Sequence, residues 1–414
     1  MPSNISISNY GSGAQNVATG SGDQNNNNAG GMQFNNSNFF GFPFSDQAGP
    51  QRLTPSRDRP SRREDFQIAI ICALPLEYDA VSLLFDQFWD EDGEQYGRAP
   101  GDTNTYTTGR IGKYDVVLAL LPNMGKAAAA AAAASVRSSY PGLKLAFLVG
   151  ICGGVPGAGA DEALLGDVVI SKTVVQHDLG RQFPNAFVAK NTVEDNLGRP
   201  NKDIRSLIAS FETELGRERL QQKAGEYLKG LQSAAARKRR RCNYQYPGAT
   251  EDKLFAAAYR HRHRAPQSCA VCNGEMDGFC EEAAKASCAE LHCDEGQLVV
   301  RKRLEMKQDL KTDGIQCPEI LIGRMASGDT VMKSGEHRDQ IAREQNVIAF
   351  EMEGAGAWDE VPCIIVKGIC DYADSHKNKM WQPFAAATAA SVMKAVLGRY
   401  TRTDDPRPAA RSTG

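Results

Sequence analysis

The chain has 414 residues, of which 41% are hydrophobic, so it is long enough to bury one large core or two ordinary ones. Its 48 lysines and arginines nearly balance its 50 aspartates and glutamates, and a net charge of −2 creates no field that attracts nucleic acid or membranes. The sequence has no apolar run of the roughly 18 residues that a membrane helix needs, and its odd number of scattered cysteines favours a reducing compartment. We therefore expect a cytoplasmic protein that has no membrane or nucleic-acid partner.

Residues 1–60 form a segment of low complexity, rich in Asn, Gly, Ser and Gln. Within it, "GSGAQN" at 11–16 returns as "GSGDQN" at 20–25, and an asparagine run follows. Such a composition cannot pack a core, so we predict a disordered tail in the monomer. Asn and Gln ladders also stack well in cross-β arrays, so the repeat is a candidate assembly motif. We predict a second flexible tail at 401–414.

Residues 61–400 have the pattern of a globular α/β domain. Apolar runs predict strands at 66–74, 114–121, 143–154, 166–175, 319–328, 347–353 and 363–374. Alanine-rich stretches at 125–140 and 384–400 predict helices. Strands that are apolar on both faces and alternate with helices indicate a sheet covered on each side, which is a three-layer αβα fold.

One interruption of this pattern, at about 217–317, reads as an insertion. Cys269 and Cys272 form a C-x-x-C pair of the kind found in zinc sites, and Cys280, Cys288, His292 and Cys293 follow. The later spacing is irregular and lacks a second C-x-x-C pair. The sequence therefore favours loop or buried thiols and predicts no metal, with Cys269 and Cys272 as the only candidates.

Four of the predicted strands end in polar or glycine-rich residues, which would meet at one edge of the sheet. These strand ends hold Glu77, Gly153, Gly154, Glu351, Glu353 and Asp371. Glu351 and Glu353 are two apart after an apolar run, so on an extended segment both would face one side. The alternative is a helix N-terminus that favours acidic residues because of its dipole. Acids at several strand ends favour the first interpretation.

The order of these motifs resembles the superfamily of purine nucleoside phosphorylases and methylthioadenosine/adenosylhomocysteine nucleosidases. The resemblance covers about 66–400 without the insertion. It depends on five short motifs in one order: "GICGG", "GDVVIS", "ASGD", "EMEG" and "CDYAD". It implies a nucleoside phosphorylase-like fold with a mixed central sheet and cleavage of the N-glycosidic bond of a purine nucleoside or nucleotide. It implies no cofactor, and we expect a homo-oligomer.

The resemblance also implies catalytic roles for three acids. Asp371 matches the general acid that protonates the leaving purine at N7. Glu77 matches the carboxylate that activates water in the nucleosidases, and Glu351 matches an acid close to that water. A departing purine leaves a cation-like sugar, so nearby carboxylates stabilise the developing charge.

The same resemblance implies a set of substrate contacts. Glu353 matches the acid that binds the ribose hydroxyls, and Met352 would pack against the sugar. Asp329, Val331 and Met332 lie in the segment that shapes the base pocket. Gly153 and Gly154 belong to the glycine turn that borders the substrate.

Three departures from the family pattern bear on the reaction. Phosphorylases of the superfamily have an arginine just before the glycine turn, where this chain has Leu148 and Val149. Val331 replaces the aromatic residue of the nucleosidases, and Cys370 replaces a serine beside the general acid. The missing arginine favours water over phosphate as the nucleophile. Two alternatives remain open: a phosphate-dependent phosphorylase and a catalytically silent module that senses a nucleoside or nucleotide.

The amino-terminal repeat resembles the Asn/Gly-rich amyloid-type signalling motifs of fungal innate-immunity-like proteins. That resemblance implies an effector domain with a nucleotide-binding oligomerisation partner that acts through the tail. It also makes a nucleotide such as ATP a candidate substrate.

Overall fold

The chain divides into two units, residues 1–57 and 58–414, and the computed structural model describes only residues of the second. The described residues are 59–91, 96–157, 162–190, 192, 194–264, 269–273, 278–309 and 316–401. The tails predicted at 1–60 and 401–414 lie almost entirely outside these residues. None of the described helices is both long and apolar enough to cross a membrane.

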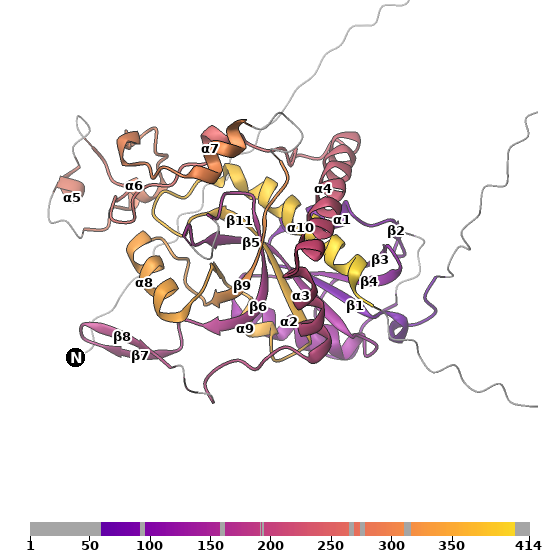
Figure 1. The fold of residues 1–414 in the computed structure, drawn as a ribbon. Coiled ribbons are helices and arrows are strands. Elements are labelled where there is room, and N and C mark those ends of the chain that lie inside the picture. Colours follow the sequence, from indigo (N-terminus) through magenta and orange to yellow (C-terminus); the bar gives the residue numbers. More distant parts are fainter. Residues whose placement is uncertain are drawn as a thin grey trace, which may run out of the picture. The chain divides into compact units, whose positions relative to one another are not determined.

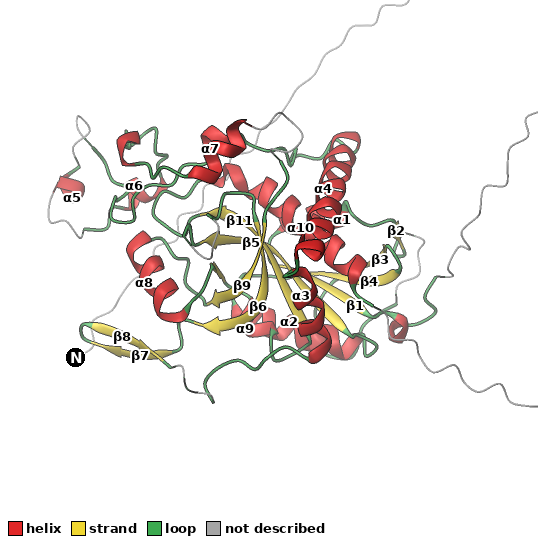
Figure 2. Ribbon diagram, viewed as in Figure 1, coloured by secondary structure: helices red, strands yellow, loops and turns green. Residues whose placement is uncertain are grey.

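The strands of the main sheet come from segments spread over the whole described chain (Figures 1 and 2). They are β1 (Ile68–Cys72), β2 (Gln87–Phe88), β3 (Tyr106–Ile111), β4 (Tyr114–Leu120), β5 (Leu145–Gly154), β6 (Val168–Gln176), β9 (Ile320–Ser327), β10 (Ala349–Glu351) and β11 (Cys363–Asp371). A separate hairpin consists of β7 (Gly180–Phe183) and β8 (Ala186–Ala189). Each strand predicted from an apolar run is present.

The sheet is mixed, and its strand order is β10-β9-β6-β11-β5-β1-β4-β3-β2. Strands β4, β1, β5 and β11 are parallel neighbours, whereas β6 runs antiparallel to β11. Strand β10 pairs with β9 and also, in antiparallel register, with β5. The strands β5, β11, β6, β9 and β10 therefore close into a small barrel, and β1 to β4 extend from it as an open sheet.

Helices cover the sheet on both faces, as Figure 2 shows. The longer helices are α1 (Pro75–Ser82), α2 (Lys126–Ser139), α3 (Lys202–Phe211), α4 (Glu214–Arg237), α7 (Lys302–Asp309), α8 (Gly335–Gln345) and α10 (Gln382–Arg399). The short ones are α5 (Ala270–Asn273), α6 (Glu281–Lys285) and α9 (Gly354–Ala357), with single 3-10 turns at Arg63–Asp65, Ala249–Glu251, Glu295–Gln297 and Lys379–Trp381. The predicted three-layer α/β fold with a mixed sheet is confirmed.

Helix α10 explains how the layers hold together. Nearly all of its residues from Phe384 to Leu397 are buried, because it packs on β5, β6 and β11 and also against α1 and α4. Its alanines allow a close approach to the sheet, where the backbone oxygen of Ala385 would lie 2.0 Å from a Cβ added at Gly368 of β11. A side chain at Gly368 would therefore push helix and sheet apart.

Helix α4 lies within the range that the sequence marks as inserted, yet it belongs to the core. Its buried residues recur at helical spacing, namely Leu220, Ala224, Leu228, Leu231 and Ala235. They pack with α10 in one continuous apolar cluster. By contrast, the described part of 249–309 contains short helices and one isolated bridge, between Phe255 and Leu298.

Candidate active site

Three strands meet at Gly153, near the carboxyl end of β5. Phe350 of β10 and Asp371 of β11 are its partners on either side. A Cβ at Gly153 would lie 3.0 Å from Oδ1 of Asp371, and one at Gly154 would lie 2.7 Å from Cγ2 of Ile369. The last two glycines of the "GICGG" motif, Gly153 and Gly154, are therefore favoured by the close approach of β11.

Glu77 lies in the first turn of α1 and is tied to the end of β5. Its Oε2 accepts hydrogen bonds from the backbone N–H groups of Ala73 and Leu74, both at 2.9 Å. Its Oε1 accepts one from the N–H of Ile151 at 2.8 Å. The side chain is buried, and burial raises its pKa, while the charge of Lys367 opposes the rise. Glu77 is thus a fixed carboxylate with increased affinity for a proton.

Glu351 and Glu353 are both buried and face the same partner, Lys367 of β11. The Nζ of Lys367 lies 2.7 Å from Oε2 of Glu353 and 3.9 Å from Oε2 of Glu351. Both oxygens of Glu351 also accept hydrogen bonds from backbone N–H groups, those of Glu353 and Gly354. Glu351 therefore positions the backbone that carries Glu353, and the two acids converge even though the backbone of Glu353 has left the extended region.

Lys367 is the residue that sequence reasoning missed. Its side chain, which ends in an ammonium group, is 2% exposed. Burial opposes that charge, but the carboxylates of Glu353, Glu77 and Glu351 outweigh burial and raise the pKa of Lys367. A signal was present, because a lysine inside the apolar run "CIIVKGIC" is unusual unless it has a buried partner. The same lysine limits the rise in the pKa of Glu351, which burial raises.

Asp371 ends β11, the strand that also carries Lys367. Its Oδ1 accepts a hydrogen bond from the N–H of Ala373 at 2.8 Å and lies 2.9 Å from Nζ of Lys377. The thiol of Cys370 donates to Oδ2 at 3.4 Å. The carboxyl group is partly exposed, so it lies where a ligand can reach it.

The remaining predicted residues differ in how closely they approach these acids. Met352 is half-buried between Glu351 and Glu353, and Met332 is buried in a small apolar cluster with Phe350 and Ala373. Val331 is 47% exposed. The structure brings Met332 to the end of β10 and leaves Val331 on the surface.

Asp329 links the first residue of α2 to the loop that follows β6. Its Oδ1 accepts a hydrogen bond from the N–H of Lys126, the first residue of α2, at 2.8 Å. Its own N–H donates to Oδ2 of Asp178, and the other oxygen of Asp178, Oδ1, pairs with Nζ of Lys126 at 2.6 Å. Asp329 thus caps α2, and its side chain is 55% exposed.

Candidate metal ligands lie outside this acidic group. Cys269 and Cys272 lie with His263 and Cys280, and a second group contains His261, Cys288, Cys293 and His376. The sequence singled out Cys269 and Cys272 but gave no role to the histidines at 261, 263 and 376, which are separated from the cysteines along the chain. His292, which it named, belongs to neither group.

The sequence is similar to a known protein family and to a curated protein. The family model described as the phosphorylase superfamily matches residues 67–400. A nucleotide-binding leucine-rich repeat (NLR)-like protein of Hyaloscypha variabilis is 30% identical over 340 residues, and the alignment spans 81% of this chain but only 29% of that protein.

Two of the similar solved structures have low sequence identity to this chain. Futalosine hydrolase of Helicobacter pylori is 16% identical, with a TM-score of 0.44 over 81% of this chain and 98% of that one. A methylthioadenosine/S-adenosylhomocysteine nucleosidase of Colwellia psychrerythraea, in complex with adenine, is also 16% identical, with a TM-score of 0.45 over 81% of this chain and 96% of that one.

Proposed function

Because the chain belongs to the phosphorylase superfamily, we propose that it cleaves the N-glycosidic bond of a purine nucleoside or nucleotide and uses water as the nucleophile. The observation that carries this proposal is the buried group of Glu77, Glu351 and Glu353 around Lys367, with Asp371 at the end of the same strand. Burying three carboxylates is costly, so a fold that retains them beside one ammonium group has a use for negative charge.

The reaction assigns a separate task to each acid. As the bond between sugar and base breaks, positive charge develops on the sugar, and the carboxylate of Glu353 stabilises it while binding the ribose hydroxyls. Asp371 donates a proton to N7 of the purine, which improves the leaving group. Glu77 accepts a proton from the attacking water. Glu351 holds the backbone of Glu353 through its hydrogen bonds.

Water fits this site better than phosphate. Leu148 and Val149 occupy the positions where phosphorylases of the superfamily have an arginine, and both are buried apolar residues. The nearby ammonium group of Lys367 is already paired with Glu353. A phosphate dianion placed among the carboxylates would be repelled, whereas a neutral water molecule would not.

A panel of substrates tests the reaction class. The purified full-length chain is incubated with purine nucleosides and nucleotides, including ATP, with and without phosphate, and free base is measured by chromatography. We expect release of base from at least one purine substrate in phosphate-free buffer. Strict dependence on phosphate would identify a phosphorylase, and tight binding without release of base would identify a sensing module.

We further propose that the domain serves as an effector in signalling of the innate-immunity type. Two observations support this role: the repeat at 11–25 and the relative named as an NLR-like protein, in which the aligned region makes up 29% of the length. The repeat would recruit a nucleotide-binding oligomerisation partner, and assembly of copies of this chain would raise the local concentration of active sites.

A further inference from the structure

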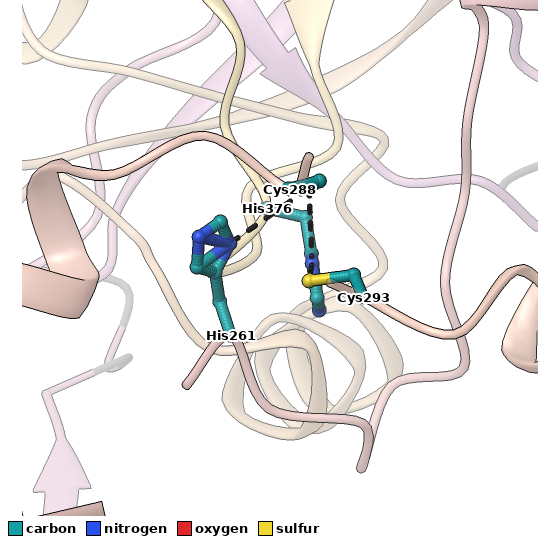
Figure 3. Close-up of side chains that lie close together, drawn as sticks. All are labelled: His261, Cys288, Cys293 and His376. Atoms are coloured by element: carbon teal, nitrogen blue, oxygen red, sulfur yellow. Dashed lines mark hydrogen bonds between the residues drawn. The ribbon is translucent and has the colours of Figure 1, made fainter. Parts of the chain in front are cut away.

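Two groups of cysteine and histidine side chains have no part in the proposed reaction. The first, called here the Cys3His cluster, contains His263, Cys269, Cys272 and Cys280. The second, the Cys2His2 cluster, contains His261, Cys288, Cys293 and His376 and is drawn in Figure 3. In each cluster the four ligand atoms all lie within 4.8 Å of one another.

The spacing in the Cys3His cluster matches a tetrahedron around a zinc ion. Bonds of about 2.3 Å to sulfur and about 2.0 Å to nitrogen place tetrahedral ligand atoms roughly 3.8 Å apart for two sulfurs and roughly 3.5 Å apart for sulfur and nitrogen. The Sγ atoms of Cys269 and Cys280 are 3.9 Å apart. Nδ1 of His263 lies 3.4 Å from Sγ of Cys272 and 3.7 Å from Sγ of Cys280.

The Cys2His2 cluster has the same dimensions. Sγ of Cys288 lies 3.8 Å from Nδ1 of His261 and 3.6 Å from Nδ1 of His376. Sγ of Cys293 lies 3.9 Å from Nδ1 of His376. Figure 3 shows the four side chains gathered at one place, although they come from separate parts of the chain.

The outer hydrogen bonds of both histidines in this cluster fix which nitrogen faces the sulfurs. Nε2 of His376 lies 2.9 Å from the backbone oxygen of Tyr259, and Nε2 of His261 lies 3.1 Å from that of Ala286. A carbonyl oxygen only accepts hydrogen bonds, so each Nε2 carries the proton. In a neutral ring Nδ1 then presents its lone pair toward the cysteines. A ligand histidine that donates its other N–H to a carbonyl is the usual arrangement at metal sites.

We propose that the chain binds two zinc ions, one in the Cys3His cluster and one in the Cys2His2 cluster. Thiolate and imidazole ligands in tetrahedral geometry select zinc over the hard cations magnesium and calcium, which prefer oxygen. Disulfides do not account for the geometry, because 3.9 Å between the sulfurs of Cys269 and Cys280 far exceeds a disulfide bond of about 2.05 Å. Four protein ligands at each centre indicate structural sites without an open position.

The segment at 261–293, which carries seven of the eight cluster residues, has too small a hydrophobic core to fix its conformation. Its helices α5 and α6 are single turns, and its own apolar cluster has only Cys272, Ala283 and Leu291 as buried members among the described residues. A core of that size cannot hold a segment of this length in one conformation. Two zinc ions would replace the missing core, as they do in small zinc-dependent domains.

The Cys2His2 ion would also join this segment to the strand that carries Asp371. His376 comes from the loop after β11 and directly precedes Lys377, whose Nζ pairs with Asp371 at 2.9 Å. The other three ligands come from the 261–293 segment. The ion would therefore fix the loop that holds Lys377 against Asp371.

The metal content of the full-length chain tests the proposal. The protein is purified without a metal-affinity step from zinc-supplemented cells, dialysed against metal-free buffer and analysed by inductively coupled plasma mass spectrometry. We expect about two zinc ions per chain. Replacement of zinc by Co²⁺ should give the absorption of tetrahedral cobalt with thiolate-to-metal charge transfer. A content of well under one ion per chain, or a cobalt spectrum without thiolate bands, would overturn the proposal.

Variants assign each ion to its cluster. Cys272→Ser and Cys293→Ser should each lower the zinc content to about one ion per chain. Cys242→Ser is the matched control, because Cys242 lies before the same segment and in neither cluster, and it should leave the content unchanged. His376→Cys keeps a ligand at its position, so it should retain both ions and increase the charge-transfer absorption of the cobalt form.

The His376→Cys variant keeps the proposal testable if a serine variant fails to fold. Unchanged zinc content in both serine variants would contradict the assignment, and so would an equal loss in Cys242→Ser. None of these measurements depends on catalysis, so their outcome is independent of the proposed reaction.

Discussion

The ammonium group of Lys367 is the counter-charge of several buried carboxylates. Its ammonium group lies among Glu77, Glu351 and Glu353, and all four residues are at most 5% exposed. Each charge would be costly to bury alone, whereas the group offsets much of the cost by mutual attraction. The carboxylates outnumber the lysine, and in the proposed reaction their excess negative charge would stabilise the cation-like sugar.

Replacing Lys367 with methionine should destabilise the fold in a pH-dependent way. The buried carboxylates lose their counter-charge, at a cost of about 3–5 kcal/mol in the free energy of unfolding. The pKa values of Glu77 and Glu351, which burial already raises, should rise further. An acid whose pKa is raised in the folded state stabilises the fold at low pH and loses that contribution as the pH rises through the folded pKa. The defect should therefore be larger at pH 8 than at pH 5.

Urea denaturation at both pH values measures this difference. The same variant should shift the acid limb of the pH–rate profile to higher pH, because Glu77 must lose its proton to act as a base. Equal destabilisation at both pH values would show that Lys367 does not interact with ionised carboxylates.

Replacing Asp371 with asparagine should separate binding from turnover. Asparagine keeps the shape and hydrogen-bonding capacity of the side chain but has no proton to transfer to the purine. We expect ligand binding to persist and kcat to fall by about two to four orders of magnitude. Calorimetry and base release measure the two effects. The matched control is Asp374→Asn, which alters the neighbouring buried acid. A parent rate in Asp371→Asn with a large loss in Asp374→Asn would move the general acid to Asp374.

The candidate acids could be selected from the sequence, but the way in which the structure groups them could not. Glu77, Glu351, Glu353 and Asp371 stand next to apolar runs in motifs that resemble a known family, so their positions are visible in the sequence. Lys367 escaped notice because it lies inside a strand, and its importance depends on which strands are neighbours. The lysine itself stands out within the apolar run "CIIVKGIC", but its partners lie on other segments, and long-range pairing of this kind leaves no local pattern.

Helix α4 shows why the limits of the insertion could not be located from the sequence. Its sequence is rich in charged residues, so it reads as a surface segment, and its apolar residues form only a narrow stripe. The stripe meets α10, which is buried along nearly its whole length. The strands were easier to predict because their apolar runs are continuous, whereas β3 ("YTTGRI") mixes threonine, glycine and arginine.

Shortening Leu228 to alanine tests whether α4 is part of the core. The side chain is 2% exposed in the main apolar cluster, so Leu228→Ala should lower the free energy of unfolding by about 2–4 kcal/mol. Arg219→Ala, on the exposed side of the same helix, should change it by less than about 0.5 kcal/mol. Urea denaturation compares the two. Similar small effects would show that α4 contributes little to the core.

Assembly through the amino-terminal repeat remains a prediction, since the repeat lies outside the described residues. The repeats at 11–16 and 20–25 have no apolar residue larger than alanine to bury, and asparagine ladders stabilise cross-β stacking. A synthetic peptide of residues 1–40 should therefore form thioflavin-positive fibres that seed fresh peptide. A scrambled peptide of the same composition is the control. A peptide that stays soluble under seeding would argue against a signalling role for the tail.

If Glu77, Glu353 and Asp371 act as proposed, water attacks the sugar as the purine leaves. The most direct test is a reaction in phosphate-free buffer made with ¹⁸O-labelled water, with mass spectrometry of the released sugar. We expect free base together with a sugar that carries one ¹⁸O atom, at a rate that added phosphate does not increase. Release of base only with phosphate, as a sugar 1-phosphate without the label, or no release from any purine substrate, would contradict it.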